Sequence, residues 1–298
     1  MVPAPVAIPL IAFGTPRKLP RARGLKGRVV VLDIAFAAGA AGASFERTTK
    51  PFIDALGDRL AMWIDHHDHV MHASFAQDPR FVLRTKAEHG ACPEMVTPER
   101  VVAAGPIDTI CCHTDFDGLC SAAKWIRGGE EPYPGADDDA RAVDTRLGKP
   151  GELATVIDRA LRARPRDDGL RGLIVRFLAE GADDRELLRA IEEAAESLRP
   201  REDSARAIAR DYEVRGEVAF VRVPQGAAPY DKTLLLMLGQ ERARISVTAD
   251  ATTVTVAARF DSGVDLLELL ELDGGMPTVV SVTPDRLDDV LQRTGFRA

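Results

Sequence analysis

Three short apolar runs, each ending in acidic or imidazole side chains, constrain the fold of this chain more than any other feature. The runs are RVVVLDIAF (28–36), RLAMWIDHH (59–67) and PIDTICCHTDFDG (106–118). Their apolar, β-branched character predicts strands that are buried on both faces, as in a parallel sheet. Stretches able to form helices lie at 44–58, 92–105 and 117–129. This alternation predicts an open α/β sheet.

The rest of the chain changes pattern twice. Residues 151–215 carry apolar positions at intervals of three and four, which predicts helices. From 216 to 298, GEVAFVRVP, KTLLLMLGQ, ARISVTAD, TTVTVAARF and TVVSVT read as short strands, and GVDLLELLEL and PDRLDDVLQRT as helices. We therefore expect an α/β protein with a parallel-sheet domain at 1–150, a helical linker at 151–215 and a smaller C-terminal α/β domain at 216–298. A cleft between the lobes is the expected substrate site.

Composition narrows the class of partner and the compartment. A net charge of −7 gives little general attraction for a long polyanion such as duplex DNA, although a short nucleotide can be held by a local basic pocket or by metals. The four cysteines form no CxxC pair, which is typical of free thiols in a reducing compartment. No apolar run reaches the roughly 18 residues of a membrane span. We expect a cytoplasmic protein that does not bind membranes.

The segment HTDFDG (113–118) alternates an imidazole with two carboxylates. Alternate side chains of an extended segment point to one side, so His113, Asp115 and Asp117 would converge. Such a set suits Mn²⁺, Mg²⁺, Fe²⁺ or Zn²⁺. Gly118 would let the chain turn into a helix whose N-terminal N–H groups can face a phosphate. For this segment alone, an acidic loop that caps a helix is the alternative.

The other two strand ends carry similar chemistry. In Asp65-His66-His67, neighbouring imidazoles would point in opposite directions, so that one binds metal and the other faces the substrate. Asp65 would fix a histidine tautomer. Asp33 ends an apolar strand, where a buried carboxylate is costly without a partner such as a metal. Convergent carboxylates repel unless cations are present, and two metal ions would activate water and stabilise an in-line phosphoryl displacement.

Asp33, DHH at 65–67 and HTDFDG at 113–118 resemble the signature elements of the DHH phosphoesterase superfamily. In the C-terminal lobe, VAARFDSGVDLLELLELDGGMPTVVSV (256–282) resembles the DHH-associated substrate-binding domain of that superfamily. The likeness covers most of the chain and leaves residues 1–27 outside it. It implies a metal-dependent phosphoesterase that holds two Mn²⁺ ions, with Mg²⁺ as a substitute.

The resemblance also implies a role for each matching residue. His67 would contact the scissile phosphate, with Asp65 behind it, and Arg259 and the Gly274–Gly275 turn would hold the phosphate or terminal group of the nucleotide. The two ions would be held by six residues: Asp33 as the bridge, His113 and Asp115 at one ion, and His66, Asp117 and Asp144 (in RAVDTRLG) at the other.

Two features depart from the pattern of the superfamily. The HxDxDG element usually precedes the lone aspartate and DHH, whereas here it follows them, which indicates a circular permutation. Because ligand geometry depends on position in space, the same site can still assemble. The glycine-rich turn usually reads GGGH. Here it reads DGGMP (273–277), and the lack of the histidine points to a different substrate or to weaker recognition of the same one.

The expected substrate is a short nucleotide: a dinucleotide, a cyclic dinucleotide, an oligonucleotide end or a nucleoside bisphosphate. A single-strand exonuclease is the alternative within this class, and PRKLPRARGLKGR (16–28) is the basic cluster that would favour it, although it is also typical of a flexible arm. A nucleotide-binding regulatory protein without turnover is the alternative from another class. A dehydrogenase-like binder is disfavoured because no GxGxxG follows the first strand. A homodimer is left open.

The remaining histidines, tryptophans and acidic residues that could carry chemistry are expected to have structural roles. His69 and His72 are expected near the ligands or at the surface, and the acidic run Asp137–Asp139 is expected in a solvated loop. Trp63 and Trp125 are expected in the core.

Overall fold

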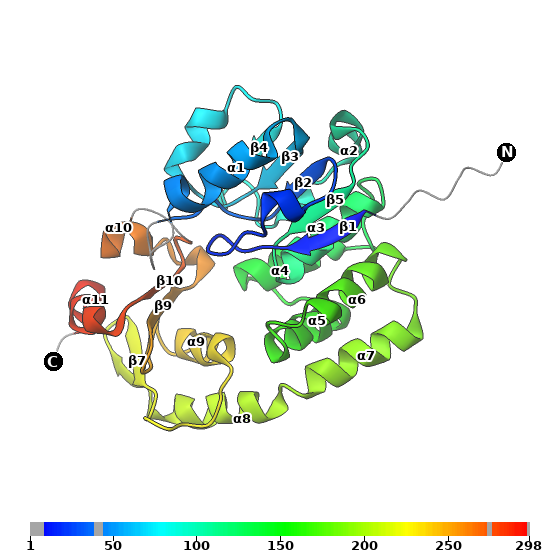
Figure 1. Cartoon of the computed structure of the whole chain (residues 1–298). Coiled ribbons are helices and arrows are strands. Elements are labelled where there is room, and N and C mark those ends of the chain that lie inside the picture. The colour runs from blue at the N-terminus through cyan, green and yellow to red at the C-terminus, as the bar shows by residue number, and fades with distance from the viewer. Residues whose placement is uncertain (1–8, 39–43, 273–275, 297–298) are drawn as a thin grey trace.

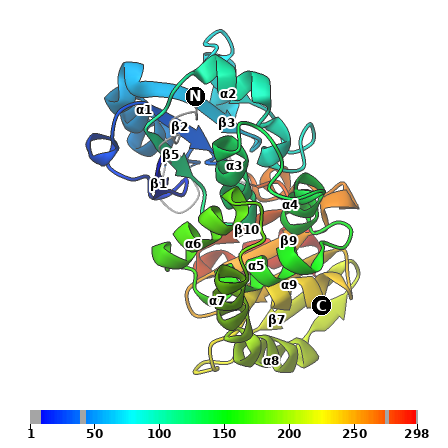
Figure 2. The same cartoon turned by 90° about the vertical axis from the view of Figure 1, so that its right-hand side faces the viewer.

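The computed structural model describes residues 9–38, 44–272 and 276–296, and these form two lobes, each built on a five-stranded sheet (Figure 1). Helices run along one side of the molecule from the first lobe to the second (Figure 2). The expected fold class, an α/β protein with a parallel-sheet domain and a smaller C-terminal sheet, is confirmed.

The first sheet is parallel throughout and has the strand order β1-β5-β2-β3-β4. Its strands are β1 (Leu10–Phe13), β2 (Val29–Leu32), β3 (Leu60–Asp65), β4 (Phe81–Leu83) and β5 (Thr109–Cys112). Leu32 at the end of β2 pairs with Ile64 on one side and with Cys112 on the other. Because the three strands end at the same level, the residues that follow them emerge at one edge of the sheet.

Both faces of this sheet are buried, as the apolar runs predict. Val30 and Leu32 contribute to one hydrophobic cluster, and Val29 and Val31 contribute to another on the opposite face. The helices of this lobe are α1 (Lys50–Leu56), α2 (Pro98–Ala104), α3 (Phe116–Ile126) and α4 (Ala136–Thr145). The core positions expected for Trp63 and Trp125 are confirmed, and all four cysteines are buried and unpaired.

One local expectation in this lobe is wrong. Asp137–Asp139 lie in the first turn of α4 and do not form a loop. Carboxylates are favoured there because the N-terminus of a helix carries partial positive charge. In addition, Lys124 of α3 pairs with Asp137 at 2.5 Å.

The helices that follow the first lobe are divided between the two hydrophobic cores. They are α5 (Glu152–Ala163), α6 (Asp168–Ala179), α7 (Arg185–Glu196) and α8 (Arg199–Ile208). Ile157, Ile174 and Ile191 of the first three helices belong to the same cluster as β2, β3 and β5. Ile208 of α8 belongs to a cluster of the second lobe.

The second sheet is mixed and has the order β10-β9-β8-β7-β6. Its strands are β6 (Glu213–Arg215), β7 (Val218–Arg222), β8 (Ile245–Ala249), β9 (Val254–Ala258) and β10 (Val279–Val282). The helices are α9 (Lys232–Gln240), α10 (Leu266–Leu270) and α11 (Leu287–Thr294). Only the β7–β8 pair is parallel among the strand pairs of the described part of this sheet.

The segment KTLLLMLGQ is α9, and its expected strand is wrong. Two parallel strands such as β7 and β8 need a crossover connection, which α9 provides. Asp231 caps the helix by accepting a hydrogen bond from the Leu234 N–H at 3.3 Å. Leucine and methionine are also good helix formers.

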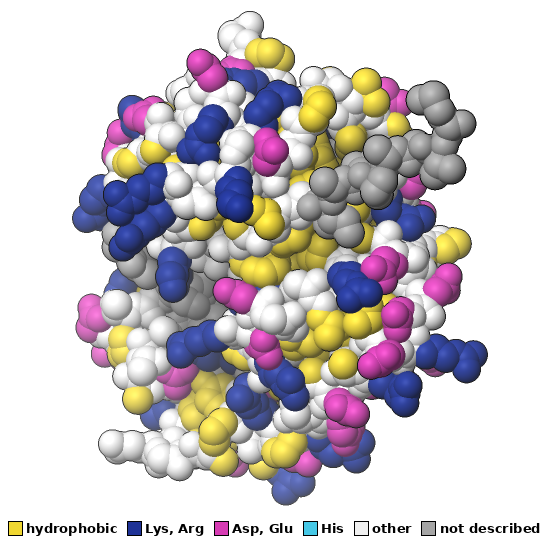
Figure 3. All heavy atoms as spheres, turned by 45° about the vertical axis from the view of Figure 1, so that its right-hand side comes forward, with side chains coloured by type: hydrophobic (Ala, Val, Ile, Leu, Met, Phe, Trp, Pro, Cys, Tyr) yellow, Lys and Arg dark blue, Asp and Glu magenta, His cyan; other side chains and the backbone are white. Residues whose placement is uncertain are grey.

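The face in Figure 3 mixes acidic and basic side chains, with apolar side chains between them. Within the described part of the chain, we find no helix with the length and apolar character that crossing a membrane requires.

Candidate metal centre and catalytic cleft

Asp33 lies at the centre of the acidic and imidazole side chains that gather at the edge of the first sheet. It follows β2 with a φ of 59°, in the left-handed region that few residues other than glycine and asparagine adopt. The side chain is 1% exposed, and neither carboxylate oxygen has a hydrogen-bond partner among the described residues. A buried, ionisable group in a costly backbone conformation is typical of a functional site.

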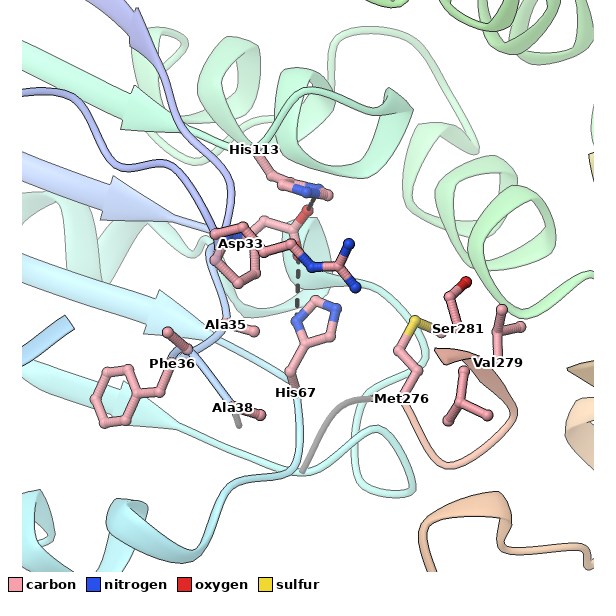
Figure 4. Close-up of a pocket in the computed structure, with 13 residues that line it drawn as sticks. Asp33, Ala35, Phe36, Ala38, His67, His113, Met276, Val279 and Ser281 are labelled. Carbon is pink, nitrogen blue, oxygen red and sulfur yellow. Dashed lines mark ion pairs between the residues drawn. The ribbon is translucent and has the colours of Figure 1, made fainter. Parts of the chain in front are cut away.

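The two oxygens of Asp33 face different histidines. Oδ1 lies 3.2 Å from Nε2 of His66, and Oδ2 lies 3.6 Å from Nδ1 of His113. Figure 4 shows Asp33 between His113 and His67, with dashed lines for its ion pairs. Three sets of ligand atoms each lie within 4.8 Å of one another: Asp33–His66–His67, Asp33–His113–Asp115 and His66–Asp117–Asp144. All six predicted ligands are therefore brought together, and Asp33 belongs to two of the sets.

The Asp33–His113–Asp115 set is positioned by the start of α3. Asp115 caps the helix, with one oxygen accepting from the Gly118 N–H at 3.1 Å and the other 2.7 Å from Nδ1 of His113. A Cβ at Gly118 would come within 2.7 Å of the Cβ of His113 and 2.8 Å of its carbonyl oxygen. Glycine is therefore required here because the helix start packs directly on the His113 backbone.

The His66–Asp117–Asp144 set is more deeply buried. Nδ1 of His66 lies 2.8 Å from the carbonyl oxygen of His89 and donates to it, so Nε2 faces Asp117 at 3.2 Å and Asp144 at 3.8 Å. Burial alone would lower the pKa of His66, but Asp117 and Asp33 raise it to about 12. Burial and the nearby Asp33 raise the pKa of Asp117 well above its usual range. Without a metal, this set therefore holds protons.

Lys86 is a member of this cluster that the sequence does not reveal. Its ammonium is 4% exposed, donates to Asp144, and lies 3.4 Å from Nε2 of His66. Burial opposes its charge, yet Asp144 and Asp117 raise the pKa of Lys86. A single lysine in the polar stretch LRTKAEHG has no spacing or periodicity that would mark it as part of a site.

His67 and Asp65 form a pair behind the cleft. Nδ1 of His67 lies 2.8 Å from Oδ1 of Asp65, which is fully buried and whose Oδ2 has no hydrogen-bond partner among the described residues. Burial would raise the pKa of Asp65, but His67 more than offsets this effect and lowers it. The pair fixes the imidazole so that its other nitrogen is left for the cleft.

A cavity of about 230 Å³ opens in front of these residues. Asp33, His67 and His113 line it on the side of the sheet, and Met276, Val279 and Ser281 of the C-terminal lobe lie opposite (Figure 4). The expected cleft between the lobes is therefore present. Its lining also includes Arg17, Phe36 and Val280.

Arg17 is a cleft residue that the sequence interpretation missed. The basic segment 16–28 is compatible with a flexible arm, but here it begins in a closed turn in which Thr15 and Lys18 exchange backbone hydrogen bonds of 3.0 and 2.9 Å. The signal that could have located it is Pro16, because proline favours the second position of a tight turn.

Arg259 lies outside the cavity that holds Asp33. It lines a neighbouring cavity of about 240 Å³ together with Asp144 and Arg146, and it pairs with Asp261 at 2.8 Å. Met276 lines both cavities. The predicted substrate residues Gly274 and Gly275 lie outside the described residues. His69 and His72 belong to none of the ligand sets and contact the ring of Phe36.

The donor set suits a hard or borderline divalent cation. Carboxylate oxygens and imidazole nitrogens are the ligands that Mn²⁺, Mg²⁺ and Zn²⁺ take in proteins. The two oxygens of Asp33 accept no hydrogen bond from the described residues, and the surrounding carboxylates raise the pKa of both His66 and Lys86, so the cluster favours positive charge. An ion at Asp33–His113–Asp115 would take the place of the proton shared by His113 and Asp115, whose ligand atoms lie 2.7 Å apart. An ion at His66–Asp117–Asp144 would have to displace the Lys86 ammonium from Asp144.

No protein-family model matches the chain, and no curated protein matches it. Among solved structures, it is similar to a pGpG-specific phosphodiesterase, PggH from Vibrio cholerae, with a TM-score of 0.49 and 12% identity over 90% of this chain and 97% of that one. It is also similar to exonuclease RecJ bound to manganese (TM-score 0.44, 13% identity, 90% and 73% covered) and to RecJ with Mn²⁺ from Thermus thermophilus (0.49, 11%, 95% and 51%). These are likenesses of fold at low identity.

Proposed function

We propose that this chain is a divalent-metal-dependent phosphoesterase that hydrolyses phosphate esters of short nucleotides. The observation that carries the proposal is Asp33, whose buried carboxylate has no hydrogen-bond partner among the described residues and faces a histidine-containing ligand set on either side. The motif resemblance to DHH phosphoesterases supports the same chemistry.

The proposed metal ligands are those that the resemblance implies. Asp33 would contribute to both sites, His113 and Asp115 would hold one ion, and His66, Asp117 and Asp144 would hold a second ion once Lys86 has moved. Mn²⁺ is the proposed metal, with Mg²⁺ as a substitute. When bound, such ions supply Lewis-acid stabilisation of phosphate oxygens and lower the pKa of water.

The residues of the cleft have complementary tasks. His67, held by Asp65 at Nδ1, would direct its other ring nitrogen toward a non-bridging oxygen of the scissile phosphate. Arg17 is an exposed cation in the same cavity and would hold the negative charge of that phosphate. The apolar wall of Ala35, Met276 and Val279 would hold the nucleoside and exclude water.

The direct test is hydrolysis of bis-p-nitrophenyl phosphate with Mn²⁺, followed by a screen of dinucleotides, cyclic dinucleotides, oligonucleotide ends and nucleoside bisphosphates. The Asp115→Ala variant is expected to lose both hydrolysis and Mn²⁺ binding. Wild-type protein that binds Mn²⁺ but cleaves none of these esters would instead be a nucleotide-binding protein without turnover.

A further inference from the structure

The second lobe contains a cavity of about 750 Å³ at the carboxyl ends of β7 and β8, the parallel pair that α9 connects. This distal cavity is lined by Arg222, by Ala249 and by the loop 223–230 between β7 and α9. No described residue lines both this cavity and the one that holds Asp33, and β7 and α8 lie far from β2 and β3 in both Figure 1 and Figure 2. Ligands of α/β sheets commonly bind at the carboxyl ends of parallel strands, and this volume is typical of small-molecule sites.

The walls of the distal cavity are fixed by hydrogen bonds. The Val223 N–H donates to the carbonyl of the last residue of β8 at 2.8 Å, and the Ala227 N–H donates to the Pro224 carbonyl at 3.1 Å, which closes a turn. The Tyr230 hydroxyl donates to Oδ2 of Asp250 at 2.9 Å. Because the loop is held in this way before any ligand arrives, binding would order little of the chain.

The distal cavity is locally basic in a chain whose net charge is −7. Its charged lining residues are Arg201, Arg222, Lys232 and Asp250. Asp250 pairs with Lys232 at 2.7 Å, which leaves the charges of the two arginines in excess. The side chain of Arg222 is exposed and, within the ranges that the structure describes, has neither a hydrogen bond nor an ion pair. Its guanidinium is therefore available to an anion.

Arg201 connects the distal cavity to the junction between the lobes. Its Nη1 donates to the carbonyl of Ala163 at the end of α5 at 3.2 Å, and its own carbonyl accepts from the Asp231 N–H at 3.0 Å. Asp231 caps α9 and also pairs with Arg162 of α5. A ligand bound to Arg201 would therefore lie against the contacts between α5 and the second lobe.

The helix α9 extends from the distal cavity to the cleft between the lobes. Lys232 in its first turn lines the distal cavity, and the next residue, Thr233, lines the cavity that contains Arg259 and Asp144. Because a helix moves as a rigid element, a displacement of its N-terminal turn would also move the wall of the second cavity.

We propose that the distal cavity is a regulatory site for a small organic phosphate of nucleotide size, which binds through Arg222 and Arg201. The planar fork of a guanidinium matches the oxygens of a phosphate. The cavity is too large for a phosphate ion alone, and Pro224, Ala227 and Tyr230 line it beside the arginines, where they would contact the organic part of the ligand. Binding at this site does not depend on the proposed phosphoesterase function. The bound ligand would act on the lobe junction through Arg201 and on the cleft through α9.

The test uses the four common nucleoside 5′-monophosphates, with adenosine as a ligand without phosphate and inorganic phosphate as a ligand without an organic group. Dissociation constants are measured by titration calorimetry on the metal-free full-length chain. The variant Arg222→Gln is expected to bind the preferred monophosphate about 10- to 100-fold more weakly than the wild type. The control Arg210→Gln removes an exposed arginine that lines neither the distal nor the catalytic cavity, and it should bind as the wild type does.

Hydrogen–deuterium exchange of the same proteins locates the ligand. In the wild type, the preferred monophosphate should slow exchange at 222–232, which form the cavity, and change it at 158–163 at the end of α5. Neither effect is expected in Arg222→Gln at the same ligand concentration. A monophosphate that binds only in the catalytic cleft would instead protect the segments around Asp33 and His113 in both proteins.

Three results would overturn the proposal: no binding of any monophosphate, equal dissociation constants for the wild type and Arg222→Gln, or protection confined to the catalytic cleft. Inorganic phosphate or adenosine that binds as tightly as the best monophosphate would also overturn it. Slower exchange at 222–232 without any change at 158–163 would overturn the regulatory role. Hydrolysis of bis-p-nitrophenyl phosphate with Mn²⁺ and no nucleotide is measured separately, so a failure of the phosphoesterase proposal is distinguished from a failure of the distal site.

Discussion

Asp33 combines two features that are unfavourable for folding and that point to a proposed role as a metal ligand. Its positive φ and its buried carboxylate, which accepts no hydrogen bond from the described residues, are unfavourable for folding. The lack of a hydrogen bond is accounted for if the carboxylate serves as a ligand, because a bound cation would interact with its oxygens. A substitution of Asp33 is therefore the sharpest test of the proposed metal centre.

The substitution Asp33→Asn should remove metal binding while keeping the fold. Asparagine tolerates the left-handed conformation and has nearly the same shape, but it lacks the negative charge. We expect Mn²⁺ affinity and ester hydrolysis to fall by at least about 100-fold, because even partners behind a metal ligand contribute 10- to 100-fold. Metal titration and circular dichroism check the two halves of this prediction. The exposed control Asp54→Asn should behave as the wild type, and an Asp33→Asn protein with normal Mn²⁺ affinity would contradict it.

The position of Lys86 leads to a second prediction about a single residue. Its ammonium donates to Asp144 and lies beside Nε2 of His66, so it competes with any ion for the ligand atoms of that set. We expect Lys86→Met to tighten the binding of a second ion by about tenfold or more, because a unit charge at about 4 Å contributes several kcal/mol even in a partly screened interior.

Equilibrium dialysis with metal analysis measures this change in stoichiometry and affinity. The matched control is Lys124→Met, which removes another buried lysine that pairs with an aspartate, Asp137, outside the ligand sets. Equal binding curves for the wild type and Lys86→Met would show that Lys86 does not compete with the ion. Thermal unfolding of both variants shows whether each retains its fold.

The sequence predicts which acidic and imidazole side chains come together at the sheet edge, because they lie near the end of an apolar run or in a recognisable motif. Lys86 and Arg17 could not be predicted in the same way. Each stands in a polar stretch, and its position depends on how a loop folds back onto the sheet. The roles of the acidic and imidazole side chains as metal ligands, and those of His67 and Arg259 at the substrate, stay predictions.

At the scale of elements, strand register assembles the site. β5 comes after β3 and β4 in the chain, yet it pairs with β1 and β2. The apolar runs predict the three central strands but not their order, because a parallel strand can insert wherever its crossover reaches. β4 is three residues long, too short for a periodic signal, and β1 follows the proline-interrupted segment VPAPVAIP, which argues against a strand. The circular permutation stays a hypothesis drawn from motif order.

The turn between β8 and β9 provides a prediction of stability against pH. Asp250 accepts from the N–H groups of Thr252 and Thr253 at 2.8 and 2.9 Å and pairs with Lys232 at 2.7 Å. Partial burial opposes ionisation, but the hydrogen bonds, led by that of Lys232, lower the pKa of Asp250. The carboxylate therefore stabilises the fold above its unfolded pKa of about 3.9 and loses this effect as the pH falls below that value.

Asp250→Asn is expected to cost about 1–3 kcal/mol of unfolding free energy at pH 7. Urea unfolding at pH 7 and again below pH 3.5 measures the difference between the variant and the wild type, which should shrink at the lower pH. The exposed variant Asp138→Asn is the control. A deficit that does not change with pH would indicate that packing is the cause.

At the scale of the whole molecule, the hydrophobic cores divide the chain between α7 and α8. The cluster of the first lobe extends through Ala194 and Ala195 of α7. Ala205 and Ile208 of α8 pack instead with Tyr212, Val221 and Leu235 of the second lobe. The predicted domain boundaries at 150 and 215 follow changes in the spacing of apolar residues along the sequence. This spacing indicates whether a segment is a helix or a strand, but not the lobe against which it packs.

This division predicts which C-terminal fragment folds by itself. A fragment of residues 197–298 retains α8 and Tyr212, whose hydroxyl donates to the Leu235 carbonyl at 2.9 Å, whereas a fragment of residues 216–298 lacks both. Burial of a large apolar side chain contributes about 1.5–3 kcal/mol, so losing Ile208 and Tyr212 should cost the shorter fragment at least about 3 kcal/mol. We expect a cooperative thermal transition by circular dichroism for 197–298 and a broad or absent one for 216–298. If the two fragments unfold at the same temperature with equal cooperativity, α8 belongs to a separate linker and the boundary at 215 holds.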